Sequence, residues 1–206
     1  MSSMTIEEVS TAPRMRAADR RELILEAATA VFGAKTYVGT TTDEVARAAG
    51  VSQPYVVRLF GTKEKLFISV IERAYGRLLD EFRRALPGDA EGRSERMGTA
   101  YTGLLVERGM LSVIANSTAL GGEPEIGRVA RAGFSEIWRF VREDAGFSAE
   151  ETRAFMAQGM LINTIVGLRL TGDYGTETAA TEVLDTCFVD SVEKARNLMP
   201  EAGEPW

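Results

Sequence analysis

Side chains that could carry acid–base or nucleophilic chemistry are sparse in this sequence. There is no histidine among its 206 residues, which excludes Ser–His and Cys–His nucleophiles and the commonest metal ligand. The single cysteine, Cys187, falls on an apolar helical stripe and is expected to serve packing. Adjacent carboxylates at Glu143/Asp144 and Glu150/Glu151 are interpreted as solvated helix ends. The sequence therefore predicts no catalytic residue, no metal site and no cofactor.

A second group of residues, between Thr41 and Lys63, has the spacing of two short helices joined by a tight turn. Thr41 and Glu44 fit a capping box, in which the hydroxyl and the carboxylate satisfy the first backbone N–H groups of a helix. Gly50 suits the left-handed position that ends this helix, and Ser52 suits the cap of the next one. The spacing predicts a helical hairpin.

The second of these helices presents a polar and aromatic face. Val56 and Phe60 lie four residues apart and are expected to pack inward. The residues left facing outward are Gln53, Pro54, Tyr55, Val57 and Arg58. Such a face after a glycine-containing turn is typical of the helix-turn-helix, whose second helix enters the major groove of DNA. The same spacing also fits an ordinary hairpin within an all-α core.

Three segments carry residue identities characteristic of a known family. Residues 45–52 read V-A-R-A-A-G-V-S, residues 62–66 read T-K-E-K-L, and residues 24–32 read I-L-E-A-A-T-A-V-F. Residues 20–82 thereby resemble the DNA-binding head of the TetR/AcrR family of bacterial transcriptional regulators. The resemblance implies a dimeric repressor that binds a palindromic operator of double-stranded DNA and is released by a small-molecule effector in its helical body. The alternative is an all-α ligand-binding module or enzyme in which the hairpin is only structural.

The resemblance also implies which residues contact DNA. The predicted contacts are Thr41, Thr42, Gln53, Pro54, Tyr55, Arg58 and Lys63, joined by Arg14 and Arg16 of a basic arm that would reach phosphates or the minor groove. Gln53 is the expected base reader, because glutamine pairs bidentately with adenine. Val57 and Leu59 stand where the family often has Tyr or His, so Tyr55 and Arg58 are expected to hold the DNA backbone instead.

Charge is divided unevenly along the chain. The overall charge is −6, of which residues 1–12 contribute −2, residues 13–63 contribute +3 and residues 64–206 contribute −7. The basic part coincides with the predicted DNA-binding head, while the acidic body would be repelled by phosphates. No long uncharged apolar run and no secretory signal are present, and one cysteine suits a reducing compartment. We expect a cytoplasmic protein without a membrane span.

The remaining sequence is helical by its apolar period and its glycine and proline positions. We expect a disordered basic arm at 1–18, a helix-turn-helix domain at 19–63, a linking helix at 63–86, an effector-binding and dimerisation domain at 87–199, and a frayed tail at 200–206. Predicted helices cover 19–34, 94–119 as one helix or two with the break near Gly109, 125–144, 148–170 and 178–199. Asp19 with Glu22, and Ser148 with Glu151, have capping-box spacing. Thr36 replaces the glycine usual in the family, and Gly39 is expected to supply that turn.

Two sets of body residues are assigned to function. Gly159, Asn163 and Gly167 recur every four residues, and the resemblance places this face, with Leu184 and Phe188 of the last helix, in a four-helix dimer interface. Packing within one chain is the alternative. The second set comprises aromatic, methionine and amide side chains suited to an effector cavity: Tyr101, Asn116, Phe134, Trp138, Met156 and Met160.

Overall fold

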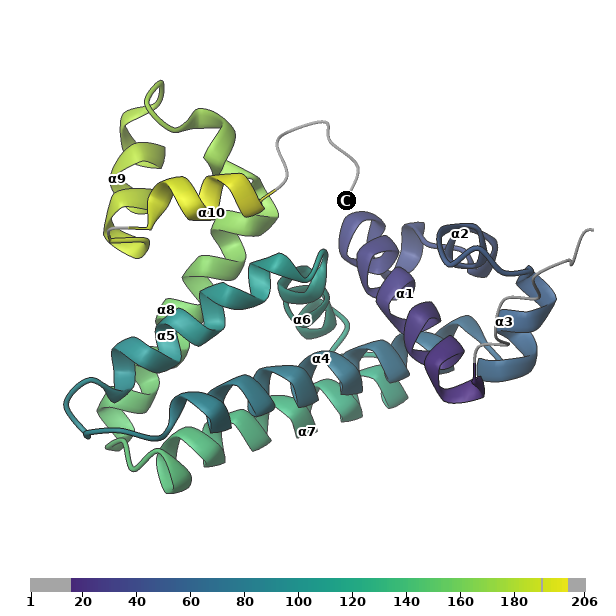
Figure 1. Ribbon diagram of the computed structural model, residues 1–206, viewed down its shortest axis with the longest axis horizontal. Coiled ribbons are helices and arrows are strands. Elements are labelled where there is room, and N and C mark those ends of the chain that lie inside the picture. The colour runs from purple at the N-terminus through teal and green to yellow at the C-terminus, as the bar shows by residue number, and fades with distance from the viewer. Residues whose placement is uncertain (1–15, 190, 200–206) are drawn as a thin grey trace, which may run out of the picture.

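The structure, a computed structural model, describes residues 16–189 and 191–199. Within these ranges the chain is helical and contains no strand, which confirms the all-α prediction. Helices α1, α2 and α3 form a head at one end, and α4 runs from the head along α7 through the body (Figure 1). Helices α9 and α10 lie at the other side of the body, beyond α8. Arg14 and the predicted tail at 200–206 lie outside the described residues.

The head contains α1 (Ala17–Gly39), α2 (Thr42–Ala48) and α3 (Gln53–Phe60). The capping box of α2 forms as predicted: the Thr41 N–H donates to Glu44 Oε2 at 2.9 Å, and the Glu44 N–H donates to Thr41 Oγ1 at 3.2 Å. Gly50 takes a φ of 63° and turns the chain into α3. Apolar residues of all three helices, among them Ile24, Phe32, Val45 and Val56, are buried in one core together with Phe67 of α4.

Both ends of α1 differ from the prediction. The helix begins at Ala17, after the N-cap residue Arg16, and no side-chain capping bond forms there, so the Asp19–Glu22 capping box is wrong. The turn near its C-terminus lies at Thr36, with φ 60° and ψ 178°, and not at Gly39. The Thr40 hydroxyl donates to the Thr36 carbonyl at 2.8 Å, a contact that holds this unusual backbone conformation.

The body is built from the following segments: α4 (Lys63–Ala85), α5 (Arg93–Gly103), a 3₁₀ turn (Leu104–Val106), α6 (Met110–Ala119), α7 (Pro124–Arg139), a π-helical turn (Phe140–Asp144), α8 (Ala149–Leu168), a 3₁₀ turn (Leu170–Asp173), α9 (Thr178–Cys187) and α10 (Val192–Leu198). The predicted break occurs at Gly109, with φ 78°. The Ser148–Glu151 capping box opens α8. The prediction of one continuous helix over 178–199 is wrong, because the Ser191 N–H bonds to the Phe188 carbonyl at 2.8 Å and turns the chain between α9 and α10.

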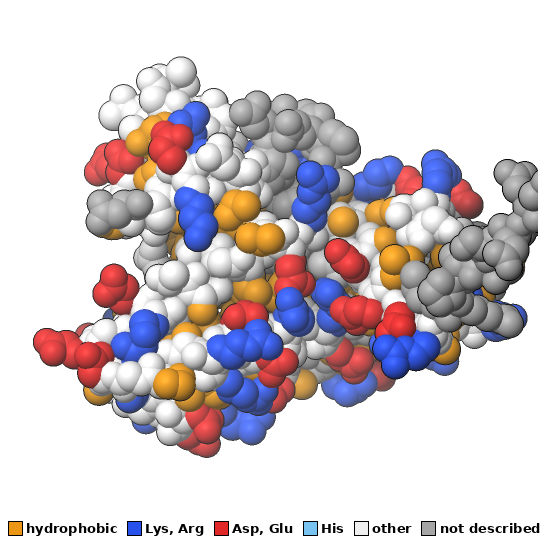
Figure 2. Space-filling view, viewed as in Figure 1, with side chains coloured by type: hydrophobic (Ala, Val, Ile, Leu, Met, Phe, Trp, Pro, Cys, Tyr) orange, Lys and Arg blue, Asp and Glu red, His pale blue; other side chains and the backbone are white. Residues whose placement is uncertain are grey.

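Head and body meet in a very close backbone contact. A Cβ atom added to Gly33 of α1 would lie 2.4 Å from the Gly109 Cα at the start of α6. Beside it, Arg73 of α4 donates to Glu22 of α1 at 2.7 Å and to Glu107 at 3.3 Å, and Arg77 Nε donates to Glu107 at 2.9 Å. Acidic and basic side chains intermix over this face (Figure 2). The joint therefore combines glycine-mediated packing with ion pairs that link three separate segments.

Candidate nucleic-acid interface and body cavity

Helix α3 presents a mixed outward face. Val56 and Phe60 are buried as predicted, whereas Pro54, Val57 and Arg58 are exposed. Leu59 is exposed as well. Gly61 ends the helix in a backbone conformation with φ 84°, and Thr62 caps α4 by accepting the Lys65 N–H at 3.1 Å. Pro54, Val57, Arg58 and Leu59 thus form the solvent-exposed part of α3.

Gln53 is half-buried and is oriented by α2. Its Nε2 donates to the Thr42 hydroxyl at 3.2 Å. A primary amide has two N–H groups and a carbonyl oxygen, so this bond leaves the amide a second N–H and its oxygen, the pair that adenine requires in the major groove. The structure brings Thr42 and Gln53 together, a contact that the sequence did not predict.

Tyr55 is half-buried between two arginines. The Arg58 guanidinium lies 4.9 Å from the centre of its ring, and that of Arg20 in α1 lies 5.6 Å away. Arg21 lies similarly over Phe60, at 5.2 Å. The sequence analysis assigned no contact to Arg20 or Arg21, because the packing of the first turn of α1 on α3 is a tertiary contact. Together these arginines border α3 with positive charge.

Lys63, the first residue of α4, holds the end of α1 in place. Its Nζ donates to the carbonyls of Tyr37 and Thr40 at 3.1 and 3.2 Å, and it lies 4.5 Å from the centre of the Tyr37 ring. An ammonium group has three donors, so one more is available for phosphate. The sequence predicted the phosphate contact but not the two carbonyl partners.

Glu44 is held as an anion beside the predicted phosphate-binding threonines. A hydrogen bond from Lys35 lowers its pKa to about 2, with further contributions from the Thr41 backbone N–H and hydroxyl. Lys35 also balances the charge of this carboxylate, which reduces the repulsion that it would exert on DNA phosphate. Farther out, Arg16 is exposed, with its Nε 3.1 Å from Asp19 Oδ2.

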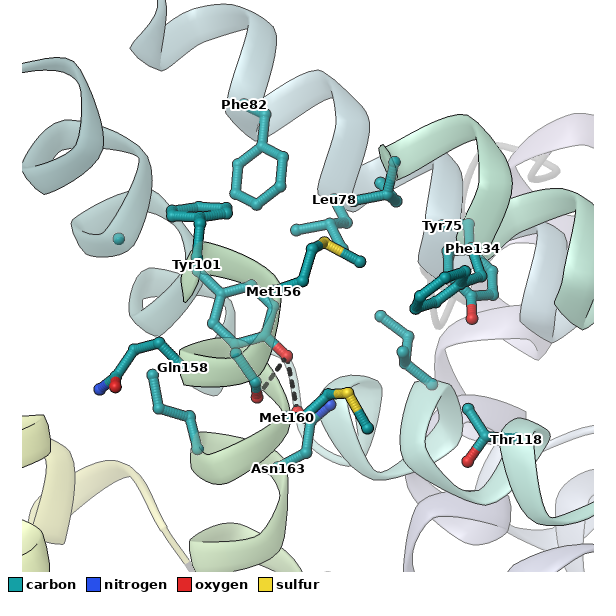
Figure 3. A pocket seen from close by; sticks show the side chains of 16 residues that line it. Tyr75, Leu78, Phe82, Tyr101, Thr118, Phe134, Met156, Gln158, Met160 and Asn163 are labelled. Carbon is teal, nitrogen blue, oxygen red and sulfur yellow. Dashed lines mark hydrogen bonds between the residues drawn. The ribbon is translucent and has the colours of Figure 1, made fainter. Parts of the chain in front are cut away.

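The body contains a cavity with about 100 Å³ of free space (Figure 3). Its lining comes from helices α4 to α8: Tyr75, Leu78, Phe82, Gly98, Tyr101, Ile114, Thr118, Phe134, Ile137, Phe155, Met156, Gln158, Gly159, Met160, Ile162 and Asn163. The Tyr101 hydroxyl donates to Asn163 Oδ1 at 2.7 Å and lies 3.3 Å from the Gly159 carbonyl oxygen. Burial raises the pKa of Tyr101 far above its usual range, so the phenol is neutral.

The body residues assigned to the effector cavity and to the dimer interface do not all lie where the sequence placed them. Tyr101, Phe134, Met156 and Met160 line the cavity, and the half-buried Asn116 and Trp138 do not. Two residues assigned to the dimer interface, Gly159 and Asn163, face Tyr101 of the same chain. Leu184 and Phe188, assigned to the same interface, are buried within the chain, whereas Gly167 is exposed with open space beside it. A four-residue period groups side chains on one face of a helix but does not say what that face meets.

The described residues contain no group of three or more His, Cys, Asp or Glu side chains able to hold a metal ion. None of the helices in the same ranges is long and apolar enough to cross a membrane.

Comparison with known proteins gives matches concentrated in the head. A family model described as bacterial regulatory proteins, tetR family, matches residues 24–70. The regulator BetI of Rhizobium meliloti is 36% identical over 74 residues, covering 36% of either chain. The activator FasR of Mycolicibacterium smegmatis is 35% identical over 75 residues, covering 36% of this chain and 34% of its own. The matched part of the chain thus spans about a third of the length of these curated relatives.

Solved structures match over most of the chain at low sequence identity. A TetR-like transcriptional regulator from Rhodococcus sp. RHA1 has a TM-score of 0.62 at 19% identity, covering 84% of this chain and 96% of its own. The fatty acid degradation regulator FadR from Bacillus halodurans has a TM-score of 0.58 at 17% identity, covering 92% of this chain and all of its own. These similarities extend the shared fold from the head to the body.

Proposed function

The chain belongs to the TetR family of bacterial regulatory proteins, matched over residues 24–70, and on this premise we propose that it is a transcriptional regulator. Its head binds double-stranded DNA through α3, and a small molecule in the body cavity releases it. The observation that supports this most is the outward face of α3, where Gln53 is pre-oriented by Thr42 and Arg20, Arg21 and Arg58 supply positive charge.

The DNA-contacting residues divide into two roles. Gln53 reads a base edge, while Pro54, which has no N–H to leave unpaired, lets the start of α3 approach the groove closely. Thr41, Thr42, Tyr55, Arg58 and Lys63, with Arg14 and Arg16 of the arm, contact the phosphate backbone. Such contacts fix the register of the protein and make its affinity salt-dependent.

The protein acts in the cytoplasm as a homodimer, because a palindromic operator has two half-sites and each requires a head. The interface is formed by the outer face of α8, where Leu161 and Leu168 are 40% and 64% exposed in the single chain. Gly167 and Thr164 lie on the same exposed surface and allow close approach of a second helix. Leu184 and Phe188 have no role in it, since they are buried within one chain.

Binding, and not catalysis, is the function of the body. The cavity lining consists of neutral side chains, which favours a ligand site over acid–base chemistry. Repression is the expected mode, in which the head blocks a promoter until the ligand is bound.

The roles of Gln53 and Lys63 can be tested by fluorescence anisotropy with a palindromic duplex from upstream of the gene. Gln53→Ala is expected to cost about 1–3 kcal/mol at one base position per half-site and to relax preference there. Lys63→Ala is expected to weaken binding to every sequence and to lower the salt slope by about 1.

Two controls accompany this test. Lys194→Ala removes an exposed cation of α10, far along the chain from the head, and should leave the salt slope unchanged. Thermal unfolding of Lys63→Ala separates loss of phosphate contact from loss of its bonds to Tyr37 and Thr40. Equal losses on every sequence from Gln53→Ala and Lys63→Ala would contradict the division of roles, and absence of duplex binding at low salt would contradict the proposed function.

A further inference from the structure

We infer that the body cavity binds an uncharged, largely apolar molecule of about one aromatic ring, which carries a single hydroxyl or carbonyl group bonded to Tyr101 and Asn163. The inference rests on the proposed function, in which this cavity holds the effector, and it adds the chemical class of that effector.

The walls of the cavity exclude charge. None of its sixteen lining residues has an ionisable carboxylate, ammonium or guanidinium group, and most are aromatic or aliphatic. A charged ligand placed there would lose its hydration without gaining a counter-ion, a cost of several kcal/mol. The rings also pack on one another: Phe82 lies 5.5 Å from Phe155 and 6.4 Å from Tyr101, centre to centre. Carboxylates, phosphates and ammonium compounds are thereby disfavoured.

Five side chains of the lining are polar: Tyr75, Tyr101, Thr118, Gln158 and Asn163. Thr118 and Gln158 are exposed, and the buried Tyr75 hydroxyl is hydrogen-bonded to Ser117, which leaves the Tyr101–Asn163 pair. Tyr101 of α5 and Asn163 of α8 meet at 2.7 Å (Figure 3). The Tyr101 hydroxyl donates its one hydrogen bond to Asn163 Oδ1. The Tyr101 oxygen can still accept a hydrogen bond from a ligand, and the Asn163 NH₂ group can donate one. A ligand hydroxyl can use both, and a ligand carbonyl can use the amide. Because the other polar side chains of the lining are exposed or bonded elsewhere, the ligand needs one polar group.

The size of the cavity limits the rest of the molecule. About 100 Å³ of free space corresponds to roughly three water molecules at about 30 Å³ each, and a cavity of about 150 Å³ accepts benzene. Small movements of flexible lining residues bring the site to that size. Met160 and Phe134 are 60% and 41% exposed at the rim, and methionine side chains adapt readily to a ligand.

The lining also connects the site to the DNA-binding head. Tyr75, Leu78 and Phe82 come from α4, which starts at Lys63 in the head. Ile114 and Thr118 come from α6, whose first turn contacts α1 through Gly109. A ligand that displaces these walls therefore acts on two helices that contact the head.

Four probes with one seven-carbon skeleton test the inference: benzyl alcohol, toluene, benzoate and benzylammonium. Binding to the full-length protein at pH 7.5 is measured by titration calorimetry and thermal shift. Benzyl alcohol is expected to bind about fivefold more tightly than toluene, the ratio typical of one neutral hydrogen bond. Benzoate and benzylammonium are expected to give no shift at the same concentrations.

Matched variants locate the polar contact. Tyr101→Phe keeps the ring and removes the hydroxyl, and Asn163→Leu keeps the volume and removes the amide; either should reduce benzyl alcohol to the affinity of toluene while leaving toluene unchanged. Tyr174→Phe removes a hydroxyl that bonds to Asp185 at 2.8 Å outside the cavity, and it should change neither affinity.

Several results would overturn the inference. They are tighter binding of either charged probe, an alcohol-to-toluene ratio unaffected by Tyr101→Phe and Asn163→Leu, and no binding by any of the four probes. The same samples are titrated with the operator duplex. Duplex binding together with one of these results refutes only the ligand class, whereas loss of duplex binding at low salt refutes the proposed function whatever the calorimetry gives.

Discussion

The contact between Gly33 and Gly109 makes a sharp prediction about stability. In Gly33→Ala, the new Cβ would lie 2.4 Å from the Gly109 Cα and 2.7 Å from its carbonyl oxygen. Both are backbone atoms, so no side-chain rotation can relieve the overlap, and α1 must move away from α6. Overpacking of this kind typically costs about 1–3 kcal/mol. We therefore expect the variant to unfold at a lower urea concentration than an alanine variant of a helix glycine that has no such overlap.

Gly76→Ala is the matched control for this substitution. Gly76 is exposed in the middle of α4, and a Cβ added there has no neighbour within 4 Å. Replacing glycine by alanine inside a helix gains about 1 kcal/mol, so Gly76→Ala should be more stable than the unchanged protein. Gly33 also lies in a helix, so both variants receive a similar gain. The difference between the two variants in the free energy of unfolding therefore measures the steric cost at Gly33. We expect this cost to be about 1–3 kcal/mol.

The measurement is urea unfolding at fixed protein concentration, followed by circular dichroism. Equal midpoints and equal slopes for the two alanine variants would refute the reasoning, because they would mean that α1 and α6 do not touch at these glycines. A second measurement, affinity for the operator duplex, should fall for Gly33→Ala and stay constant for Gly76→Ala, since only the first displaces the head from the body.

Two further predictions concern the head. Thr36→Gly should raise the free energy of unfolding by about 1 kcal/mol, because Thr36 is exposed and its φ of 60° with ψ of 178° belongs to a region that costs about 1–3 kcal/mol for residues other than glycine; a lower urea midpoint would contradict this. Glu44 has a folded-state pKa of about 2, below its ordinary 4.5, so its stabilising contribution is fully present above pH 4.5 and is lost as the pH falls toward 2. Urea titrations between pH 5 and 2.5 should therefore show a smaller loss of stability for Glu44→Gln than for the unchanged protein. Identical losses would show that the bonds of Glu44 to Lys35 and Thr41 do not stabilise the fold.

Features set by neighbours in the sequence were predictable. The capping boxes at Thr41 and Ser148 depend on residues three positions apart, and both form. Gly50 and Gly109 mark turns because glycine adopts a positive φ at little cost, and both do so. The boundaries of α4 follow from a long apolar period and the Thr62 cap, and they agree with the prediction to within one residue.

Features set by distant residues were not predictable. The segment that follows the turn at Thr36 is held by Lys63, which bonds to the carbonyls of Tyr37 and Thr40, more than twenty positions earlier in the chain. The stacking of Arg20 on Tyr55 likewise joins residues that meet only when α1 packs on α3.

The sequence by itself determined that this chain is helical, where most of its helices begin, and that Val56 and Phe60 of α3 point inward, because these depend on local hydrogen bonds and on a period of 3.6 residues. Only the tertiary structure decided that Asn163 faces Tyr101 inside the body and that Phe188 is buried within one chain. An apolar or small-residue face is equally compatible with a cavity, a core or a partner, and the choice among them depends on how the helices are arranged in space.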